Sequence, residues 1–106
     1  MDKLTKKITA FRDARDWKQF HNAKDLAVAL NVEAGELLES FLWKDAKAAD
    51  KSKIKEELAD VFMYAILLAD QQGLDVEEIV SEKLKTNEAK YPVEKAKGNA
   101  KKYDEL

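Results

Sequence analysis

Glycine and proline are scarce in this chain, with three glycines and one proline among 106 residues. A fold of many strands needs many turns, and those turns depend on glycine and proline. No segment shows sustained alternation of apolar and polar residues with a period of two, whereas apolar residues recur at helical spacing in several segments. The sequence therefore predicts an all-α protein, with a protomer of the four-helix-bundle type.

The first two helices are predicted from apolar spacing and from one capping signal. The first spans about residues 3–17, and the connector Gln19-Phe20-His21 follows it. Asn22 is a predicted N-cap, with Asp25 three residues later, because an Asn side chain accepts a hydrogen bond from a free backbone N–H at a helix start. The second helix then extends to about Trp43 and is followed by a polar linker.

The remaining helices have clear stop signals. The third is predicted from about Ser52 to Gln72 and ends at Gly73, a residue type favoured directly after a helix. The fourth spans about residues 76–90, with Asp75 as its cap and Pro92 as its stop, because proline cannot sit in a helix interior.

Composition limits the organisation and the class of the protein. A length of 106 residues predicts one domain, residues 1–106, whose charged tail at residues 93–106 is either mobile or folded over a ligand. The net charge of −2 provides no positive field for nucleic acid or an anionic membrane. The absence of cysteine excludes disulfide scaffolds, zinc-thiolate sites and thiol catalysis.

The sequence also predicts a cytoplasmic location. The residues after Met1 lead into an amphipathic pattern and lack the apolar stretch and cleavage site of a signal peptide. The longest uncharged apolar stretch, Val61 to Ala69, is too short to span a bilayer.

That same stretch is apolar nearly all round the third helix. One face of a small bundle cannot bury so many apolar side chains. Because a chain of this length has a thin core, we expect a homo-oligomer that associates through the central helices. The alternative is that the third helix is simply the central helix of a monomer.

Two pairs of carboxylates lie three residues apart on the second and third helices. Glu33 and Glu36 form the first pair, and Glu57 and Asp60 form the second. Such spacing places both side chains on one flank of a helix, but it also arises by chance in a chain with 21 acidic residues. These pairs differ from the others because they interrupt the two most apolar helices. Gly35, inside one pair, suggests close approach of another backbone or a ligand.

Four partly buried carboxylates that face one another need a cation to neutralise them. Oxygen-only ligands without a nearby histidine favour Mg²⁺, with Mn²⁺ as an alternative ion, and argue against a di-iron bundle. The other interpretation is a solvated helix flank whose acids pair with Lys or Arg across the bundle. Spacing and context leave both interpretations open.

A resemblance to a known family favours the metal site. The chain resembles the MazG-like nucleotide pyrophosphohydrolases, and is most similar to their dCTP pyrophosphatase branch, over about nine tenths of its length. The resemblance lies in an ordered set of motifs: Asp16-Trp17, Phe20-His21, the E-x-x-E run from Glu33 to Lys44, the E-x-x-D run from Glu56 to Val61, Lys83 to Pro92, and Lys101-Lys102-Tyr103.

The resemblance implies an all-α enzyme that forms a dimer or a tetramer built from dimers. It implies hydrolysis of the α-β phosphoanhydride of a nucleoside triphosphate to give a monophosphate and pyrophosphate. It implies that Mg²⁺ is held by Glu33, Glu36, Glu57 and Asp60. One carboxylate would act as the general base, and we favour Glu36, with Glu33 next. The cytosine preference, for dCTP or a related dNTP, rests on the resemblance alone.

The resemblance also implies two binding regions for the substrate. Trp17, His21, Trp43 and Tyr64 would surround the nucleobase, where aromatic faces stack and His or Tyr supplies a hydrogen bond. The alternative for these four is ordinary core, interface or loop side chains. On the fourth helix, a stripe with a spacing of four residues would reach the β- and γ-phosphates, unless it is merely a solvated face: Lys83, Asn87 and Tyr91.

The main competing hypothesis is a non-catalytic helical interaction module. In that case the third helix forms an oligomer interface, and the acids are surface charge. A DNA-binding module is disfavoured, because basic residues are spread along the chain and matched by acids.

Overall fold

The computed structural model describes residues 2–106, and every regular element in this range is helical. This confirms the prediction of an all-α protein. The elements in chain order are α1 (Asp2–Ala14), η1 (Lys18–Phe20), α2 (Ala23–Glu39), η2 (Ala46–Ala48), α3 (Lys51–Gln71), α4 (Val76–Lys90), α5 (Val93–Ala96) and η3 (Tyr103–Glu105), where η marks a short 3₁₀ helix.

Three predicted helix boundaries are confirmed by their hydrogen bonds or backbone angles. The Asn22 side chain caps α2 by accepting from the Asp25 backbone N–H at 2.8 Å. Asp75 caps α4 by accepting from the backbone N–H of Glu78 at 2.9 Å. Gly73 follows α3 with a φ of +67°, a left-handed conformation that glycine adopts without steric strain.

Two helices end earlier than predicted. α1 ends at Ala14 because Asp16 adopts a φ of +54°, and the Trp17 backbone N–H bonds back to the carbonyl oxygen of Arg12 at 3.2 Å. Asp tolerates this left-handed geometry better than most residues do, so it can end a helix without glycine. α2 ends at Glu39, and Trp43 lies in the turn that follows, with a φ of +63°.

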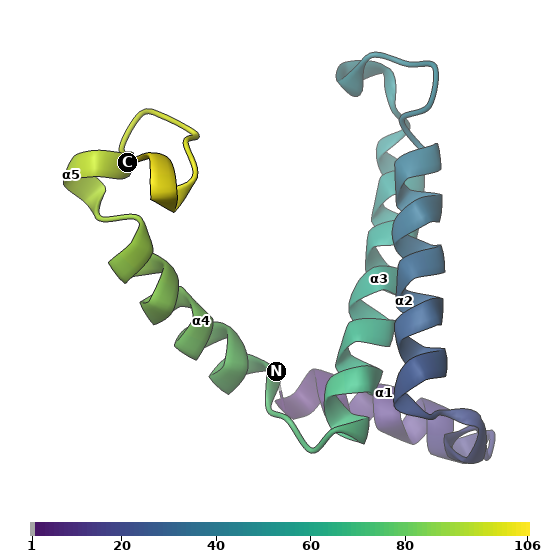
Figure 1. The fold of residues 1–106 in the computed structure, drawn as a ribbon. Coiled ribbons are helices and arrows are strands. Elements are labelled where there is room, and N and C mark those ends of the chain that lie inside the picture. The colour runs from purple at the N-terminus through teal and green to yellow at the C-terminus, as the bar shows by residue number, and fades with distance from the viewer. Residues whose placement is uncertain (1) are drawn as a thin grey trace. The chain divides into compact units, whose positions relative to one another are not determined.

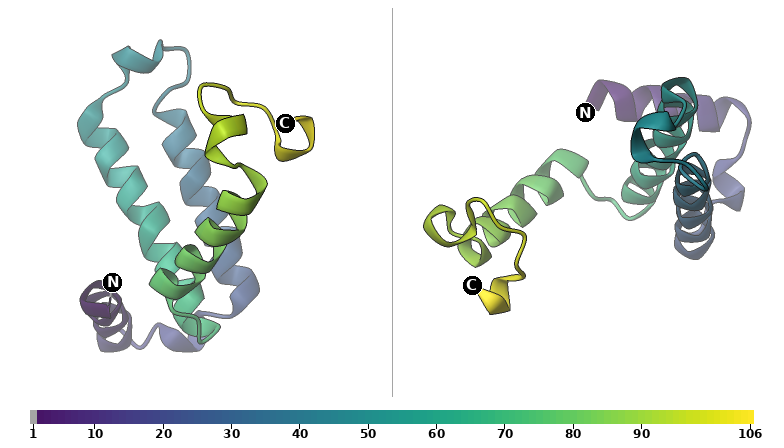
Figure 2. Two further views of the ribbon diagram at one scale, coloured as in Figure 1. Left: turned by 90° about the vertical axis from the view of Figure 1, so that its left-hand side faces the viewer. Right: turned by 90° about the horizontal axis from the view of Figure 1, so that it is seen from above.

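The chain forms two compact units, Met1–Leu74 and Asp75–Leu106. In the first unit, α2 and α3 run antiparallel side by side, and α1 crosses the end of this pair that is remote from the α2–α3 connection (Figure 1). Figure 2 shows the same crossing from two further directions. The buried apolar side chains all belong to these three helices: Ile8, Leu26, Ile66, Leu67 and Ala69.

The second unit consists of α4 and a tail that folds back onto the end of this helix. The rings of Tyr91 and Tyr103 meet edge to face, with centroids 6.2 Å apart. The Lys90 amine lies 4.7 Å from the centroid of the Tyr103 ring. The four-helix bundle and the single domain stay predictions, because α4 belongs to this second unit.

Several apolar side chains of α3 are exposed in the single chain. Leu58 is 40% exposed and Phe62 is 57% exposed, which is unusual for large apolar residues in the middle of a long helix. The predicted oligomer interface would cover them, and it stays a prediction. No helix within residues 2–106 has the length and apolar character needed to cross a membrane.

Candidate active site

Three carboxylates converge between α2 and α3. Glu33 and Glu36 project from α2, and Glu57 projects from α3. One carboxylate oxygen of each lies within 4.8 Å of the others. Because α2 and α3 run antiparallel, the C-terminal half of α2 lies beside the N-terminal half of α3, and Glu57 therefore meets the predicted pair Glu33 and Glu36.

The carboxylates are held in an environment that disfavours their charge. The Oε2 atoms of Glu33 and Glu57 are buried and have no hydrogen-bond partner among residues 2–106. Burial raises the pKa of Glu33 to about 7, with further contributions from its contact with Glu36 and from the charges of Asp60 and Glu57. The pKa of Glu57 is raised mainly by burial and then by Glu36, while Lys53 partly offsets this effect.

These residues fit a hard divalent cation. The candidate ligands are all carboxylate oxygens, which Mg²⁺ prefers, and two of the oxygens are buried without a hydrogen-bond partner within residues 2–106. Asp60, the fourth predicted ligand, is close enough to Glu33 and Glu57 for its charge to raise the pKa of both. The expected close approach of backbone to Gly35 is not found, since a Cβ there would meet nothing within 4 Å.

A cavity of about 130 Å³ lies beside the carboxylates. Glu33 and Asp60 contribute to its wall, together with three of the four predicted base-binding residues, Trp17, His21 and Tyr64. The Nδ1 atom of His21 is buried without a hydrogen-bond partner in residues 2–106. The cavity therefore combines aromatic surface with unpartnered polar atoms, which suits a flat heterocycle that carries hydrogen-bonding groups.

Sequence and structure comparisons give a consistent family assignment. Residues 28–106 match the model of the MazG-like family. The chain belongs to the MazG-like family. It is 39% identical over 104 residues to dCTP pyrophosphatase 1 of Rattus norvegicus and 36% identical to dCTP pyrophosphatase 1 of Homo sapiens. Both matches confirm the predicted resemblance to this branch.

A solved structure supports the same assignment for this MazG-like chain. The crystal structure of a pyrophosphatase from Archaeoglobus fulgidus superposes with a TM-score of 0.80 at 36% sequence identity, and the match covers 87% of this chain and 92% of that one. The two curated relatives are longer. The match takes in 91% of the MazG-like chain but only 61% of each of these relatives.

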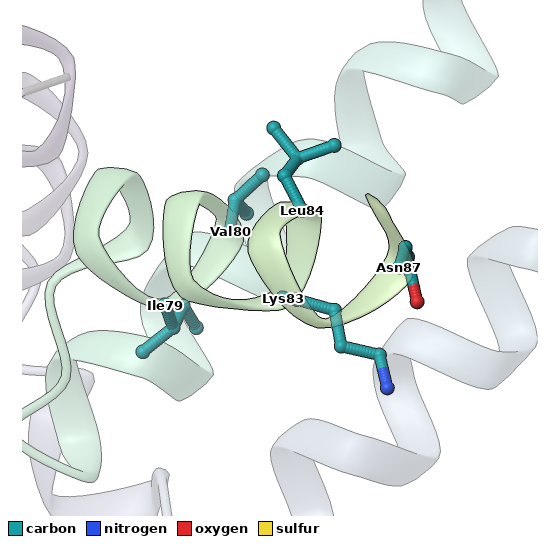
Figure 3. Close-up of a pocket in the computed structure, with 5 residues that line it drawn as sticks. All are labelled: Ile79, Val80, Lys83, Leu84 and Asn87. Atoms are coloured by element: carbon teal, nitrogen blue, oxygen red, sulfur yellow. The ribbon is translucent and has the colours of Figure 1, made fainter. Parts of the chain in front are cut away.

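Trp43 is not among the residues that line this cavity, and the three predicted phosphate-binding residues belong to the second unit. Trp43 is 100% exposed in the turn after α2. Lys83 and Asn87 belong to α4 and line a surface hollow of about 410 Å³ in the second unit, beside three apolar side chains of the same helix. Figure 3 shows Lys83 and Asn87 projecting on the same side of α4. Tyr91 follows as the C-cap of this helix.

The structure adds cavity residues that the MazG-like resemblance did not indicate: Phe11, Arg12, Met63 and Leu67. Arg12 is the least expected, because it is a charged residue with only 5% of its surface exposed. A signal was present in the sequence, since Arg12 lies four residues after Ile8 and therefore on the same apolar face of the first helix.

Proposed function

We propose that this chain is a Mg²⁺-dependent nucleoside triphosphate pyrophosphohydrolase that converts dCTP, or a related deoxynucleoside triphosphate, to the monophosphate and pyrophosphate. The observation that carries the proposal is the cluster formed by Glu33, Glu36 and Glu57 next to an aromatic cavity. The names of the relatives support the reaction class: two are dCTP pyrophosphatases, and the solved structure is of a pyrophosphatase.

The carboxylates have two roles in this proposal. Glu33, Glu36, Glu57 and Asp60 would hold the ion. When bound, Mg²⁺ supplies positive charge to the triphosphate oxygens and polarises a water for in-line attack at the α-phosphorus. One carboxylate accepts the proton of the attacking water as the α-β phosphoanhydride bond breaks and pyrophosphate leaves. Glu36 is the first choice for this base and Glu33 the second.

The cavity provides a place for the nucleobase. The Trp17 ring offers a face for stacking, and Tyr64 and His21 offer polar atoms for the edge of the base. The cavity measures about 130 Å³, and the preference for cytosine rests on the similarity to dCTP pyrophosphatases. Trp43 is proposed as a further base contact. Its full exposure in the single chain leaves its ring free to contact a ligand.

The proposal also includes the contacts to the β- and γ-phosphates and the oligomeric state. Lys83, Asn87 and Tyr91 would bind the β- and γ-phosphates through an amine, an amide and a phenol spaced four residues apart on α4. The chain would act as a homodimer or homotetramer, because association would bury the exposed Leu58 and Phe62 of α3.

The test is incubation of the purified protein with Mg²⁺ and a panel of standard and modified dNTPs, followed by separation of the products. Monophosphate and pyrophosphate are expected, with cytosine nucleotides turned over fastest. Diphosphate and orthophosphate, or no turnover of any nucleotide, would refute the proposal.

A thermal-shift measurement separates this enzyme from a non-catalytic helical module. Added Mg²⁺ is expected to raise the melting temperature of the wild type, because the ion binds only the folded carboxylate cluster. Glu57→Ala should abolish the rise and the turnover. The matched control is Glu56→Ala, which changes the adjacent, exposed glutamate of the same helix and should retain both.

A further inference from the structure

Arg12 makes the only side-chain hydrogen bond within residues 2–106 that connects partners far apart in the sequence. Its Nη1 atom donates to Asp70 Oδ2 at 2.9 Å, across 58 positions of the chain. Its Nε atom donates to Asp13 Oδ1, also at 2.9 Å, within the same helix. The contact with Asp70 therefore connects α1 to the C-terminal end of α3.

α1 has few other anchors in the first unit. Ile8 and Arg12 are its only buried residues within the described part of the chain. The ion pair of Arg12 with Asp70 is therefore one of the few buried anchors of this helix. Arg12 is buried whereas the Asp70 side chain is 35% exposed, so the pair is partly buried. Loss of Asp70 would leave Arg12 paired with Asp13 but would remove its hydrogen bond to another helix.

The aromatic wall of the cavity is built on the end of α1 and on the turn that follows. Phe11 precedes Arg12, and the Trp17 backbone N–H bonds to the Arg12 carbonyl oxygen at 3.2 Å. The rings of Phe11 and Trp17 meet edge to face, with centroids 5.7 Å apart. The Arg15 guanidinium lies 3.7 Å from the centroid of the Phe11 ring. A shift of α1 would move this wall as one piece.

The guanidinium of Arg12 is already engaged by carboxylates, which disfavours a phosphate-binding role for its side chain. Two carboxylates, of Asp13 and Asp70, already bind the guanidinium. Two more, of Glu33 and Asp60, line the same cavity. With both Asp13 and Asp70 in place as partners, the guanidinium is better suited to holding α1 against α3 than to binding the substrate.

We propose that Arg12 and Asp70 form a positioning pair, which holds α1 against α3 and so sets the width of the nucleobase cavity between Trp17 and Tyr64. The part of this inference that concerns the base rests on the proposed function. The part that concerns the wall is independent of it.

The position of the aromatic wall is tested without substrate through the solvent accessibility of the Trp17 indole. Iodide quenching of Trp17 fluorescence measures this accessibility in a Trp43→Phe background, where Trp17 is the sole tryptophan. Asp70→Ala and Arg12→Met should both increase the quenching, because α1 is released and the indole becomes more accessible. Asp13→Ala is the matched control. It removes the other partner of the same guanidinium but leaves α1 connected to α3, so quenching should stay near that of the parent.

Kinetics with the best substrate test the consequence for binding. Since displacement of a binding group by about 1 Å can cost up to about 100-fold in rate, KM should rise about tenfold in Asp70→Ala and Arg12→Met. The kcat value should change much less, and Arg12→Lys, which keeps one charged donor, should recover part of the loss. If Arg12→Met fails to fold, Asp70→Ala carries the test.

Two results would overturn the inference. One is an equal effect of Asp13→Ala and Asp70→Ala on quenching and KM. The other is a lower melting temperature in Asp70→Ala with unchanged quenching and KM, which would indicate a purely stabilising ion pair. If the wild type turns over no nucleotide, the proposed function fails, and the quenching result still decides whether Arg12 and Asp70 position the wall.

Discussion

Glu33→Gln should stabilise the metal-free protein at neutral and alkaline pH. In the wild type, burial and the charges of Glu36, Asp60 and Glu57 raise the pKa of Glu33 from 4.5 to about 7. The folded state therefore holds the proton of Glu33 more tightly than the unfolded chain does. The stability that Glu33 contributes is present below pH 4.5 and is lost as the pH rises through about 7.

The size of the effect follows from the pKa difference. At about 1.4 kcal/mol per pKa unit, a change from 4.5 to about 7 corresponds to about 3 kcal/mol. The Glu33 side chain is partly exposed, and screening by solvent reduces this to about 1–2 kcal/mol. Glutamine has nearly the same shape as a protonated glutamate but cannot ionise, so the variant should keep this stability at every pH.

Urea unfolding in the presence of EDTA, from pH 5 to pH 8, measures the difference. Glu33→Gln should exceed the wild type by about 1–2 kcal/mol at pH 8, equivalent to roughly 5–15 °C in melting temperature, and most of the gap should close at pH 5. Glu39→Gln, at an exposed position of α2, is the control and should show no such gap. Equal pH profiles for Glu33→Gln and wild type would refute the reasoning about this carboxylate cluster.

Three further substitutions test the core, a helix end and the cavity. Leu26→Ala removes most of a side chain that is only 2% exposed. It should lower the free energy of unfolding by about 2–5 kcal/mol in urea titrations. A loss of less than about 1 kcal/mol would contradict the place of Leu26 in the core. Gly73→Ala should lower the free energy of unfolding by about 1–2 kcal/mol, because alanine is strained at a φ of +67° even though its Cβ would meet no atom within 4 Å. Calorimetry at one pH measures the change. Trp17→Ala should raise KM about tenfold with a smaller effect on kcat, since base stacking on an aromatic ring contributes about 1–3 kcal/mol, and an unchanged KM would exclude Trp17 from the base site.

Helix boundaries marked by side-chain caps were predictable because the signals act within a few residues. Asn22 and Asp75 cap through bonds to backbone groups three positions away, and Gly73 ends α3 through its own backbone angle. The ends at Ala14 and Glu39 were not predicted, because Asp16 and Trp43 adopt positive φ values in turns that no glycine marks.

The acidic cluster was predictable in composition but not in geometry. The spacing of three residues placed Glu33 with Glu36 and Glu57 with Asp60 on helix flanks. This spacing alone did not distinguish the two pairs from other acidic pairs in the chain. The antiparallel packing of α2 and α3 brings one oxygen each of Glu33, Glu36 and Glu57 within 4.8 Å of the others.

By itself, the sequence determined the helical class, the caps and the ordered motifs that place the chain in the MazG-like family, because these depend on residue types at short, regular separations. Only the tertiary structure decided that Arg12 is buried against Asp70 and that Trp17, His21 and Tyr64 share one cavity. Contacts across 58 positions depend on how the helices cross. Their crossing is set by the packing of the whole unit and not by any local pattern.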